Sequence, residues 1–431
     1  MFKYVRSVLF LLISEVGLQA QTFSAPLLPG EIPAPAIHIA ESTQNALSLG
    51  LSVANELDDN AFNNDNNKET NLLTLVEPHV GWSLTLPRAT WMLNYRPGFT
   101  FGHPNSLYDS QSQLLDTNLQ FTPIKRLQVR VRESLLQSKN VFDQLEHSEP
   151  ASASSVLDRP NNSIFATARE NMQQAGADVS YALNRRTVIG TSAAFFRVSY
   201  ASAFVAQSLG SARSVGTHVF SSYRLTRHHW VGFDYSLQDL ISQPQSRSLV
   251  QSVLYTDTLL LGPTTSVSFF VGPQYSLTRG ETGLLVSPNG EPTSAQAKWS
   301  WAGGATYVWS SSRTNMTLAL ARRISDGAGL EGLVQLSSLS LAVKRQLTKH
   351  WKSQLSFSDN RNRALISSLA PLSYVSFAGG FARALNQRAS IECQYWHVHE
   401  TGSAAPLSTY LADHNRISLS LHYDFKVPLQ R

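Results

Sequence analysis

Apolar and polar residues alternate with a period of two over most of this chain. The clearest example lies near its end, where Arg416 to Phe425 reads Arg-Ile-Ser-Leu-Ser-Leu-His-Tyr-Asp-Phe. The apolar and aromatic residues of this stretch fall on one side, and Ser, His and Asp fall on the other. Such alternation predicts a β-strand with one apolar and one water-facing side.

The same alternation begins at Leu47 and returns in segment after segment. Two kinds of connection alternate between successive segments. One kind is tight and polar, at residues 87–88, 123–126, 184–186, 226–228, 262–263, 311–313, 348–349 and 386–388. The other kind is longer and carries Gly, Pro, Asn, Asp and Ser, at residues 55–71, 102–111, 139–163, 201–211, 243–247, 279–294, 326–332, 361–371 and 401–413.

Short turns at one end and long loops at the other are typical of transmembrane β-barrels with periplasmic turns and extracellular loops. We therefore predict an all-β, closed antiparallel barrel of about 18 strands, with both termini in the periplasm. About 16 strands is the alternative, because the pattern through Ser246 to Leu261 is blurred. In lipid every backbone group needs a partner, so the last strand should pair with the first.

The composition agrees with a membrane barrel. Charged residues make up 15% of the chain, whereas about a quarter is usual in soluble domains. The mean hydropathy of −0.15 does not exclude a membrane protein, because apolar and polar residues average out along barrel strands. No segment has the roughly 20 apolar residues of a transmembrane helix. The single cysteine, Cys393, is interpreted as a small apolar strand residue.

We divide the chain into four parts. Residues 1–20 have the character of a signal peptide, with Lys3 and Arg6 before an apolar core. Residues 21–45 are rich in proline and are expected to form an extended periplasmic leader. Residues 46–425 form the predicted barrel, and residues 426–431 form a short tail.

No reaction chemistry is evident. His397 and His399 have the spacing that places both rings on one side of a strand, but no third metal ligand is suggested nearby. Serine is too abundant for one nucleophile to stand out, and phosphate-binding loops and basic nucleic-acid patches are absent. We therefore expect no enzyme, no cofactor, no metal site and no nucleic-acid partner.

The informative residues are charges inside strands, because Lys or Arg facing lipid at mid-depth costs about 2 to 4 kcal/mol. The alternation predicts that these charges face the lumen. They are Arg96, Arg130, Arg132, Arg197, Arg224, Lys298, Lys344, Lys352, Asp116, Asp178, Asp234, Glu392 and Asp424. They could set a selectivity field, with Arg130 and Arg132 its most concentrated positive part, or they could form ion pairs that stiffen the wall.

Aromatic residues gather near the tight turns, as expected for a girdle at the membrane boundary. They are Trp82, Trp91, Tyr181, Tyr223, Trp309, Trp351 and Tyr423. The last strand also resembles the closing strand of bacterial outer-membrane barrels, in which a terminal aromatic preceded by a Tyr is an assembly signal. Phe425 and Tyr423 hold those places, although the family usually ends on the aromatic itself.

The span from Ala46 to Phe425 resembles the outer-membrane β-barrel porin class, and in particular porin-like proteins of exopolysaccharide loci. The resemblance implies an outer-membrane location in a Gram-negative-type bacterium, reached by the secretory pathway, with lipid and the barrel-assembly machinery as partners. It implies a passive channel for small hydrophilic solutes, including anionic ones. The alternatives are a duct for export of a polysaccharide and a non-conducting barrel that serves as a surface anchor or binding scaffold. The oligomeric state, monomer or trimer, stays open.

Overall fold

The computed structural model describes residues 45–60, 68–103, 109–139, 169–201, 211–242, 246–280, 295–325, 333–365, 372–402 and 413–429. These residues form 18 antiparallel strands of 12 to 17 residues. The strands are β1 (Ala46–Asp58), β2 (Asn71–Leu86), β3 (Ala89–His103), β4 (Ser110–Ile124), β5 (Leu127–Ser138), β6 (Glu170–Ala182), β7 (Thr187–Tyr200), β8 (Ala212–Arg224), β9 (His229–Ser242), β10 (Ser246–Gly262), β11 (Thr265–Gly280), β12 (Ala295–Ser310), β13 (Thr314–Ser325), β14 (Val334–Gln346), β15 (Trp351–Ala364), β16 (Leu372–Ala384), β17 (Ala389–Gly402) and β18 (Asp413–Pro428).

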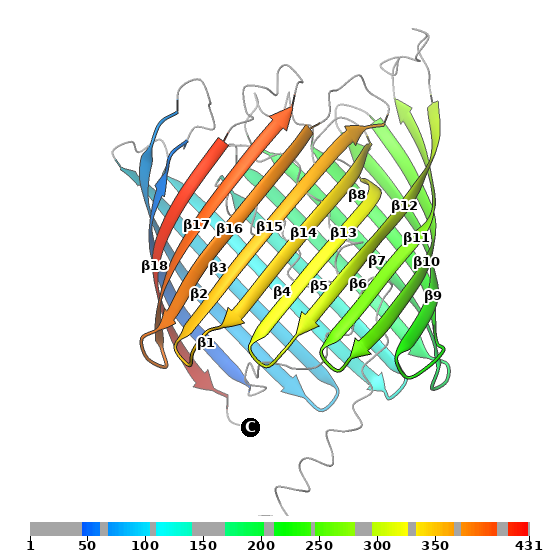
Figure 1. Ribbon diagram of the computed structural model, residues 1–431, viewed down its shortest axis with the longest axis horizontal. Helices are drawn as coiled ribbons and strands as arrows, with labels where there is room; N and C mark the ends of the chain where they lie inside the picture. Colours follow the sequence, from blue (N-terminus) through cyan, green and yellow to red (C-terminus); the bar gives the residue numbers. More distant parts are fainter. Residues whose placement is uncertain are drawn as a thin grey trace, which may run out of the picture.

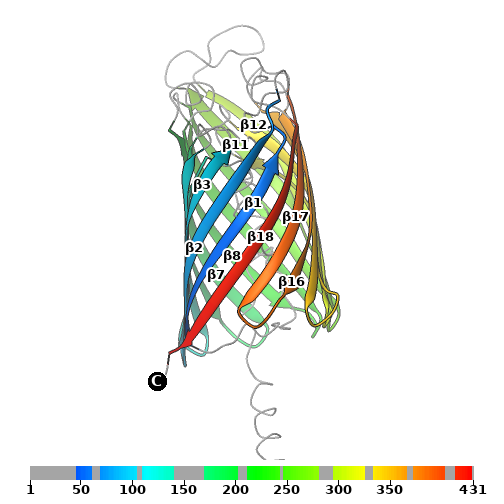
Figure 2. The same ribbon diagram turned by 90° about the vertical axis from the view of Figure 1, so that its left-hand side faces the viewer.

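Every strand pairs with its two neighbours in sequence, and β1 pairs with β18 over its whole length, from Ala46 opposite Pro428 to Asp58 opposite Arg416. The sheet is therefore a closed barrel of tilted strands (Figures 1 and 2). This confirms the predicted closure and the higher of the two expected strand numbers.

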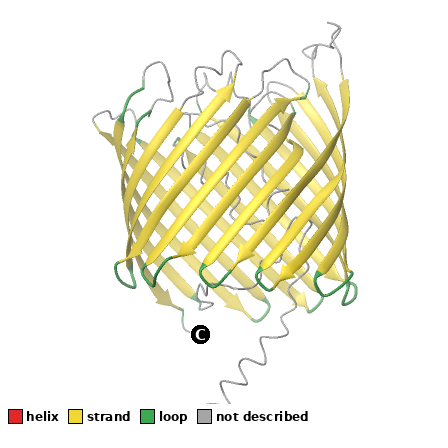
Figure 3. Cartoon of the chain, in the orientation of Figure 1, coloured by secondary structure: helices red, strands yellow, loops and turns green. Residues whose placement is uncertain are grey.

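All eight tight turns lie at the end that also holds the start of β1 and the end of β18 (Figure 3). The polar residue that opens a turn caps it. Asn184 Oδ1 accepts hydrogen bonds from the backbone N–H groups of Arg186 and Thr187, each at 2.8 Å. Asn386 does the same for Arg388 and Ala389, at 2.7 and 2.9 Å. Such side chain–backbone bonds fix a tight turn, and they explain why these positions are recognisable in the sequence.

The two faces of the sheet differ as the alternation predicts. Outward residues of β1 and β18 such as Leu49, Leu51, Leu419 and Leu421 are 41 to 52% exposed in the absence of lipid. Their neighbours on the inner face are Ser, Ala, His and charged residues. Among the described residues, no helix has the length and apolar character needed to cross a membrane. The exposed apolar band on a closed, polar-lined barrel is the form of a transmembrane β-barrel of the outer-membrane type.

The blurred pattern at Ser246 to Leu261 belongs to β10, a full strand. Its period is lost because Val250 and Leu254 are apolar yet face inward. Leu254 packs with Phe270 of β11, Ala302 of β12 and Ala321 of β13. Apolar residues on both sides of one strand remove the sequence signal, although the hydrogen-bonding register is regular from Ser246 to Leu259 against β9.

Among the described residues, the longest interruption in strand pairing lies between β12 and β13, and it is called the seam below. β12 pairs with β11 from Ala295 to Trp309, but it pairs with β13 only from Gly303 to Ser310. Above Gly303 the end of β13 parts from β12 (Figure 1). Side chains bridge the seam: Gln335 Nε2 donates to Ser300 Oγ at 2.9 Å, and Gln274 Oε1 accepts from the Ile324 N–H at 2.9 Å.

The aromatic residues predicted near the tight turns lie on the outer face at that end. Trp82, Tyr223, Trp309, Trp351 and Tyr423 are 37 to 48% exposed. The rings of Trp82 and Trp91 lie 5.1 Å apart on neighbouring strands. Amphipathic rings prefer the membrane–water boundary, so this belt marks one edge of the lipid-facing band. The predicted signal peptide, most of the predicted proline-rich leader and the stretch 140–168 lie outside the described residues.

Candidate functional site

The interior wall is the candidate site, because it carries most of the charges that lie within the strands. The register places nearly all the predicted residues on it: Arg96, Arg130, Arg132, Arg224, Lys298, Lys344, Lys352, Asp116, Asp178, Asp234, Glu392 and Asp424. Their distribution divides the wall into separate charged regions.

Arg197 is the exception, and its predicted lumen position is wrong. It is exposed and shares the outer face with Ile189, and it lies opposite Arg213 of β8. The prediction failed because β7 carries apolar residues on both faces: Phe195 and Phe196 are consecutive, so alternation alone does not decide the direction of Arg197. The register with β6 and β8 decides it.

One charged region lies on β3 to β6. Arg130 and Arg132 of β5 face inward on the same strand, and Arg132 Nη2 contacts Asp178 Oδ2 at 3.0 Å. The Asp178 side chain is only 8% exposed. Asp116 of β4 instead accepts a hydrogen bond from Ser134 Oγ at 2.7 Å. Arg96 of β3 is half-buried and forms no ion pair within the described residues, and its Nε has no hydrogen-bond partner there.

A second region lies across β17, β18 and β2, toward the tight-turn end. Glu392 contacts His422 Nε2 at 3.4 Å and accepts a hydrogen bond from Gln354 at 2.9 Å. Next to it, His79 Nε2 and Asp424 Oδ1 are 2.6 Å apart. Two imidazole–carboxylate pairs therefore lie next to each other on this part of the wall.

A third region joins the first and last strands near the long-loop end. Arg416 Nη2 contacts Glu56 Oε2, and these side chains are 2% and 5% exposed. The Arg416 guanidinium also lies over the Trp396 ring, 5.7 Å from its centroid. Sequence analysis missed this pair because Glu56 fell in an expected loop, residues 55–71, whereas β1 extends to Asp58.

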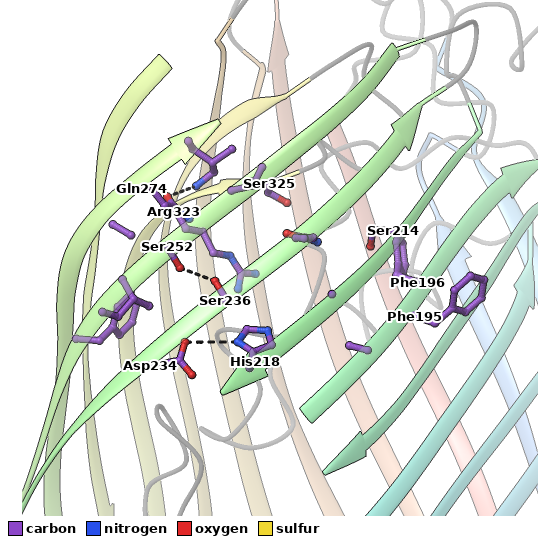
Figure 4. A pocket seen from close by; sticks show the side chains of 18 of the residues that line it. Phe195, Phe196, Ser214, His218, Asp234, Ser236, Ser252, Gln274, Arg323 and Ser325 are labelled. Carbon is purple, nitrogen blue, oxygen red and sulfur yellow. Dashed lines mark hydrogen bonds and ion pairs between the residues drawn. The ribbon is translucent and has the colours of Figure 1, made fainter. Parts of the chain in front are cut away.

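A cavity lies against the inner face of β6 to β13, with about 870 Å³ of empty space that includes open solvent. Figure 4 shows its polar side chains, among them His218, Asp234, Gln274 and Arg323. His218 Nδ1 lies 3.5 Å from Asp234 Oδ1 on the neighbouring strand. The remaining lining combines serine and glutamine side chains with apolar residues such as Phe196, Val250 and Leu254, so the cavity can contact solutes through hydroxyl and amide groups and through apolar surface.

The residues that the sequence analysis assigned to the lumen are eight basic and five acidic, an excess of three positive charges, and the full register changes this balance. Further acids also face inward, namely Glu56, Asp58, Glu77, Glu170 and Glu400. Further basic residues on the same face are Arg323, Arg416 and Lys426. With Arg197 removed, basic and acidic side chains on the described interior wall become equal in number, so the predicted excess of positive charge does not hold.

The residues considered for a metal lie outside the lumen. His397 and His399 are on the outer face of β17 and contact Asn415 and Asp413 of β18. The described residues contain no cluster of three or more His, Cys, Asp or Glu side chains arranged to hold a metal ion. Cys393 is exposed on the same outer face, opposite Leu419, as a small strand residue would be.

No protein-family model and no curated protein matches the sequence. Among solved structures, Pseudomonas aeruginosa OccK2 (OpdF) aligns over 89% of this chain and 98% of its own, with 9% identity and a TM-score of 0.45. Acinetobacter baumannii OccAB4 aligns over 90% of this chain and 100% of its own, with 9% identity and a TM-score of 0.42. Pseudomonas aeruginosa OpdL aligns over 89% and 99%, with 10% identity and a TM-score of 0.41.

Proposed function

We propose that this protein is a passive outer-membrane channel for small hydrophilic solutes. The observation that carries the proposal is the closed wall of 18 strands with an apolar outer band and a polar, charged interior. A barrel of this strand number is wide enough for a water-filled interior rather than a packed one. An interior made for water and solute is expected to hold hydroxyls, amides and charges, and this one does.

We further infer that solutes with an acidic group are favoured at the region on β3 to β6. Arg96 supports this, because its guanidinium faces the interior without an ion pair in the described part of the chain. Arg130 and Arg132 lie on β5, two strands away from Arg96 on β3, and Arg132 forms an ion pair with Asp178. A guanidinium group forms bidentate hydrogen bonds with carboxylates and phosphates. This region can therefore favour acidic solutes over neutral ones even though the charges of the whole wall are balanced.

Solute flux into liposomes tests the proposed function. Proteoliposomes should swell in neutral sugars of low mass and in sugar acids of the same size, and swelling should slow as the solute grows. A short polysaccharide should not enter at a comparable rate. Rapid entry of the polysaccharide would favour the alternative, an export duct, and no entry of any solute into liposomes that hold folded protein would favour a binding scaffold.

A further inference from the structure

Four arginines form one row on the outer face of the barrel at the long-loop end. Arg197 of β7 lies directly opposite Arg213 of β8, and Arg247 of β10 lies directly opposite Arg279 of β11. Ile241 of β9 stands between the two pairs, opposite both Arg213 and Arg247. The register therefore joins all four side chains into a continuous line across five neighbouring strands.

The row marks the boundary of the lipid-facing band. Two residues farther from the strand ends, the outer face becomes apolar on four of these strands, with Phe195, Val215, Leu249 and Leu277, while β9 places Asp239 between Val215 and Leu249. The next outward position on β11 is Tyr275, whose ring lies 5.0 Å from that of Trp299 on β12. Aromatic rings of this kind sit at the headgroup level of a membrane, so the arginines lie at or just above the headgroups.

The row carries more positive charge than the protein balances. Asp239 contacts Arg247 through two hydrogen bonds of 2.9 and 2.7 Å. No other ion pair involves these four arginines within the described residues, and all four side chains are exposed. Like charges placed directly opposite on neighbouring strands are destabilising. Two such pairs side by side are therefore best explained by an external anion that bridges them.

We propose that this row binds the phosphate groups of a phosphorylated glycolipid in the outer leaflet of the membrane. Arginine binds phosphate in two-pronged fashion. Strands lie about 4.8 Å apart, so Arg213 and Arg247, two strands apart, are separated by about 10 Å. The two pairs can thus hold two phosphates of one headgroup, while the apolar residues of the adjacent row contact its acyl chains. This site lies on the outer face and is independent of the proposed channel.

The test compares two variants that each remove two outer-face arginines. Arg197→Gln/Arg213→Gln breaks the row. Arg361→Gln/Arg363→Gln is the matched control, because both residues are exposed on the outer face of β15 at the same end, and Arg361 is neutralised by Asp359 at 2.9 Å. Each full-length protein is purified in a non-ionic detergent. Binding of diphosphorylated lipid A is measured by native mass spectrometry and by the shift in melting temperature.

We expect the wild type and the control to bind lipid A and to gain several degrees in melting temperature, and the row variant to bind at least tenfold more weakly. Lipid A without phosphates, cardiolipin and inorganic phosphate should each give a much smaller shift. Equal binding by the two variants would overturn the site. An equal shift with phosphate-free lipid A or inorganic phosphate would exclude a glycolipid site, and an equal shift with cardiolipin would assign the row to glycerophospholipids.

Folding provides a second readout. In detergent without lipid, the row variant should melt at the same temperature as the wild type or higher, because it relieves repulsion between opposed arginines. A lower melting temperature in the absence of lipid would show that the arginines stabilise the barrel itself and would contradict the proposal. The channel's conductance should be unchanged in the row variant, since no residue of the row faces the interior.

Discussion

At the scale of single residues, most interior charges have partners in the wall. Arg132 contacts Asp178, His79 contacts Asp424 and Arg416 contacts Glu56. These pairs serve two purposes, because they stiffen neighbouring strands and keep the interior polar. Arg96 differs, since it faces the interior without an ion pair in the described residues. Stability and selectivity are therefore expected to depend on different arginines.

Arg96→Gln should reduce selectivity without loss of stability. We expect the wild-type channel to show weak anion preference in reversal potentials at 0.1 M salt, and Arg96→Gln to lose much of it. The preference should fade toward 1 M salt as the Debye length shrinks from about 10 Å to about 3 Å. A cation-selective wild type, or a variant with unchanged reversal potential, would be inconsistent with this role of Arg96.

Arg132→Gln should instead weaken the barrel, because the nearly buried Asp178 loses its ion pair with Arg132. The expected cost is about 1–3 kcal/mol in the free energy of unfolding. Urea unfolding in detergent, followed by tryptophan fluorescence, measures it. Asp178→Asn/Arg132→Gln serves as the control and should recover part of the loss. An unchanged free energy of unfolding in Arg132→Gln would mean that the ion pair is too hydrated to stabilise the barrel.

Glu56 and Arg416 join the first and last strands, and both are nearly buried. Arg416→Met alone should cost about 3–5 kcal/mol, since it leaves a buried carboxylate without its counter-charge. The double variant Glu56→Gln/Arg416→Met should be clearly more stable than the single one. A double-mutant cycle in urea checks this, and strict additivity of the two changes would show that the ion pair does not couple the strands.

At the scale of strands and turns, much could be predicted from the sequence. All eight tight turns fall where the sequence indicated, and in two of them Asn184 and Asn386 cap the turn with their own side chains. The alternation of apolar and polar residues in β10 was unclear because the apolar Leu254 packs inward against Phe270. The direction of Arg197 was missed because Phe195 and Phe196 are consecutive. Such choices depend on the register with neighbouring strands, which a single strand's sequence does not contain.

The closing strand is expected to be essential. Deletion of residues 416–431 removes nearly all of β18, together with Tyr423 and Phe425, and leaves both β1 and β17 with an unpaired edge. An open edge is not tolerated in lipid, so the truncated protein should fail to insert. Heat-modifiable migration of outer-membrane fractions measures insertion, and a heat-modifiable truncated band would refute the role of this strand.

The seam between β12 and β13 should be the least protected part of the wall. Residues 295–302 of β12 lack the β13 partner that residues 303–310 have. Hydrogen exchange in lipid nanodiscs should therefore be faster over 295–302 than over 303–310 of the same strand. Residues 274–279 of β11 serve as the control for depth, because they lie opposite 295–300 at the same end of the barrel and are paired on both sides. Equal protection of the two halves would show that the seam is closed in the membrane.

Topology follows from the positions of turns and loops. The turn at Arg185 should face the periplasm, and residue 155, which lies outside the described residues, should face the exterior. In a Cys393→Ser background, a membrane-impermeant thiol reagent on intact cells should label Ser155→Cys but not Arg185→Cys. Labelling of position 185 but not of position 155 would show that the barrel has the opposite orientation in the membrane.

At the scale of the whole molecule, an apolar outer band, a closed sheet and a polar interior define a transmembrane β-barrel, and we propose that it is a pore. The balanced charge of the described interior wall predicts modest ion selectivity rather than a strong preference. The arginine row outside the wall adds a contact with lipid that does not involve the pore. Transport and lipid anchoring are thus expected to be separable by mutation.

Single-channel recording in a planar lipid bilayer tests the central claim most directly. Wild-type protein that is folded, as shown by heat-modifiable migration, should give discrete current steps at 1 M KCl, and their size should rise with salt concentration. The Arg361→Gln/Arg363→Gln variant should give steps of the same size. Folded wild-type protein that inserts into the bilayer and conducts no ions would contradict the account of a passive channel.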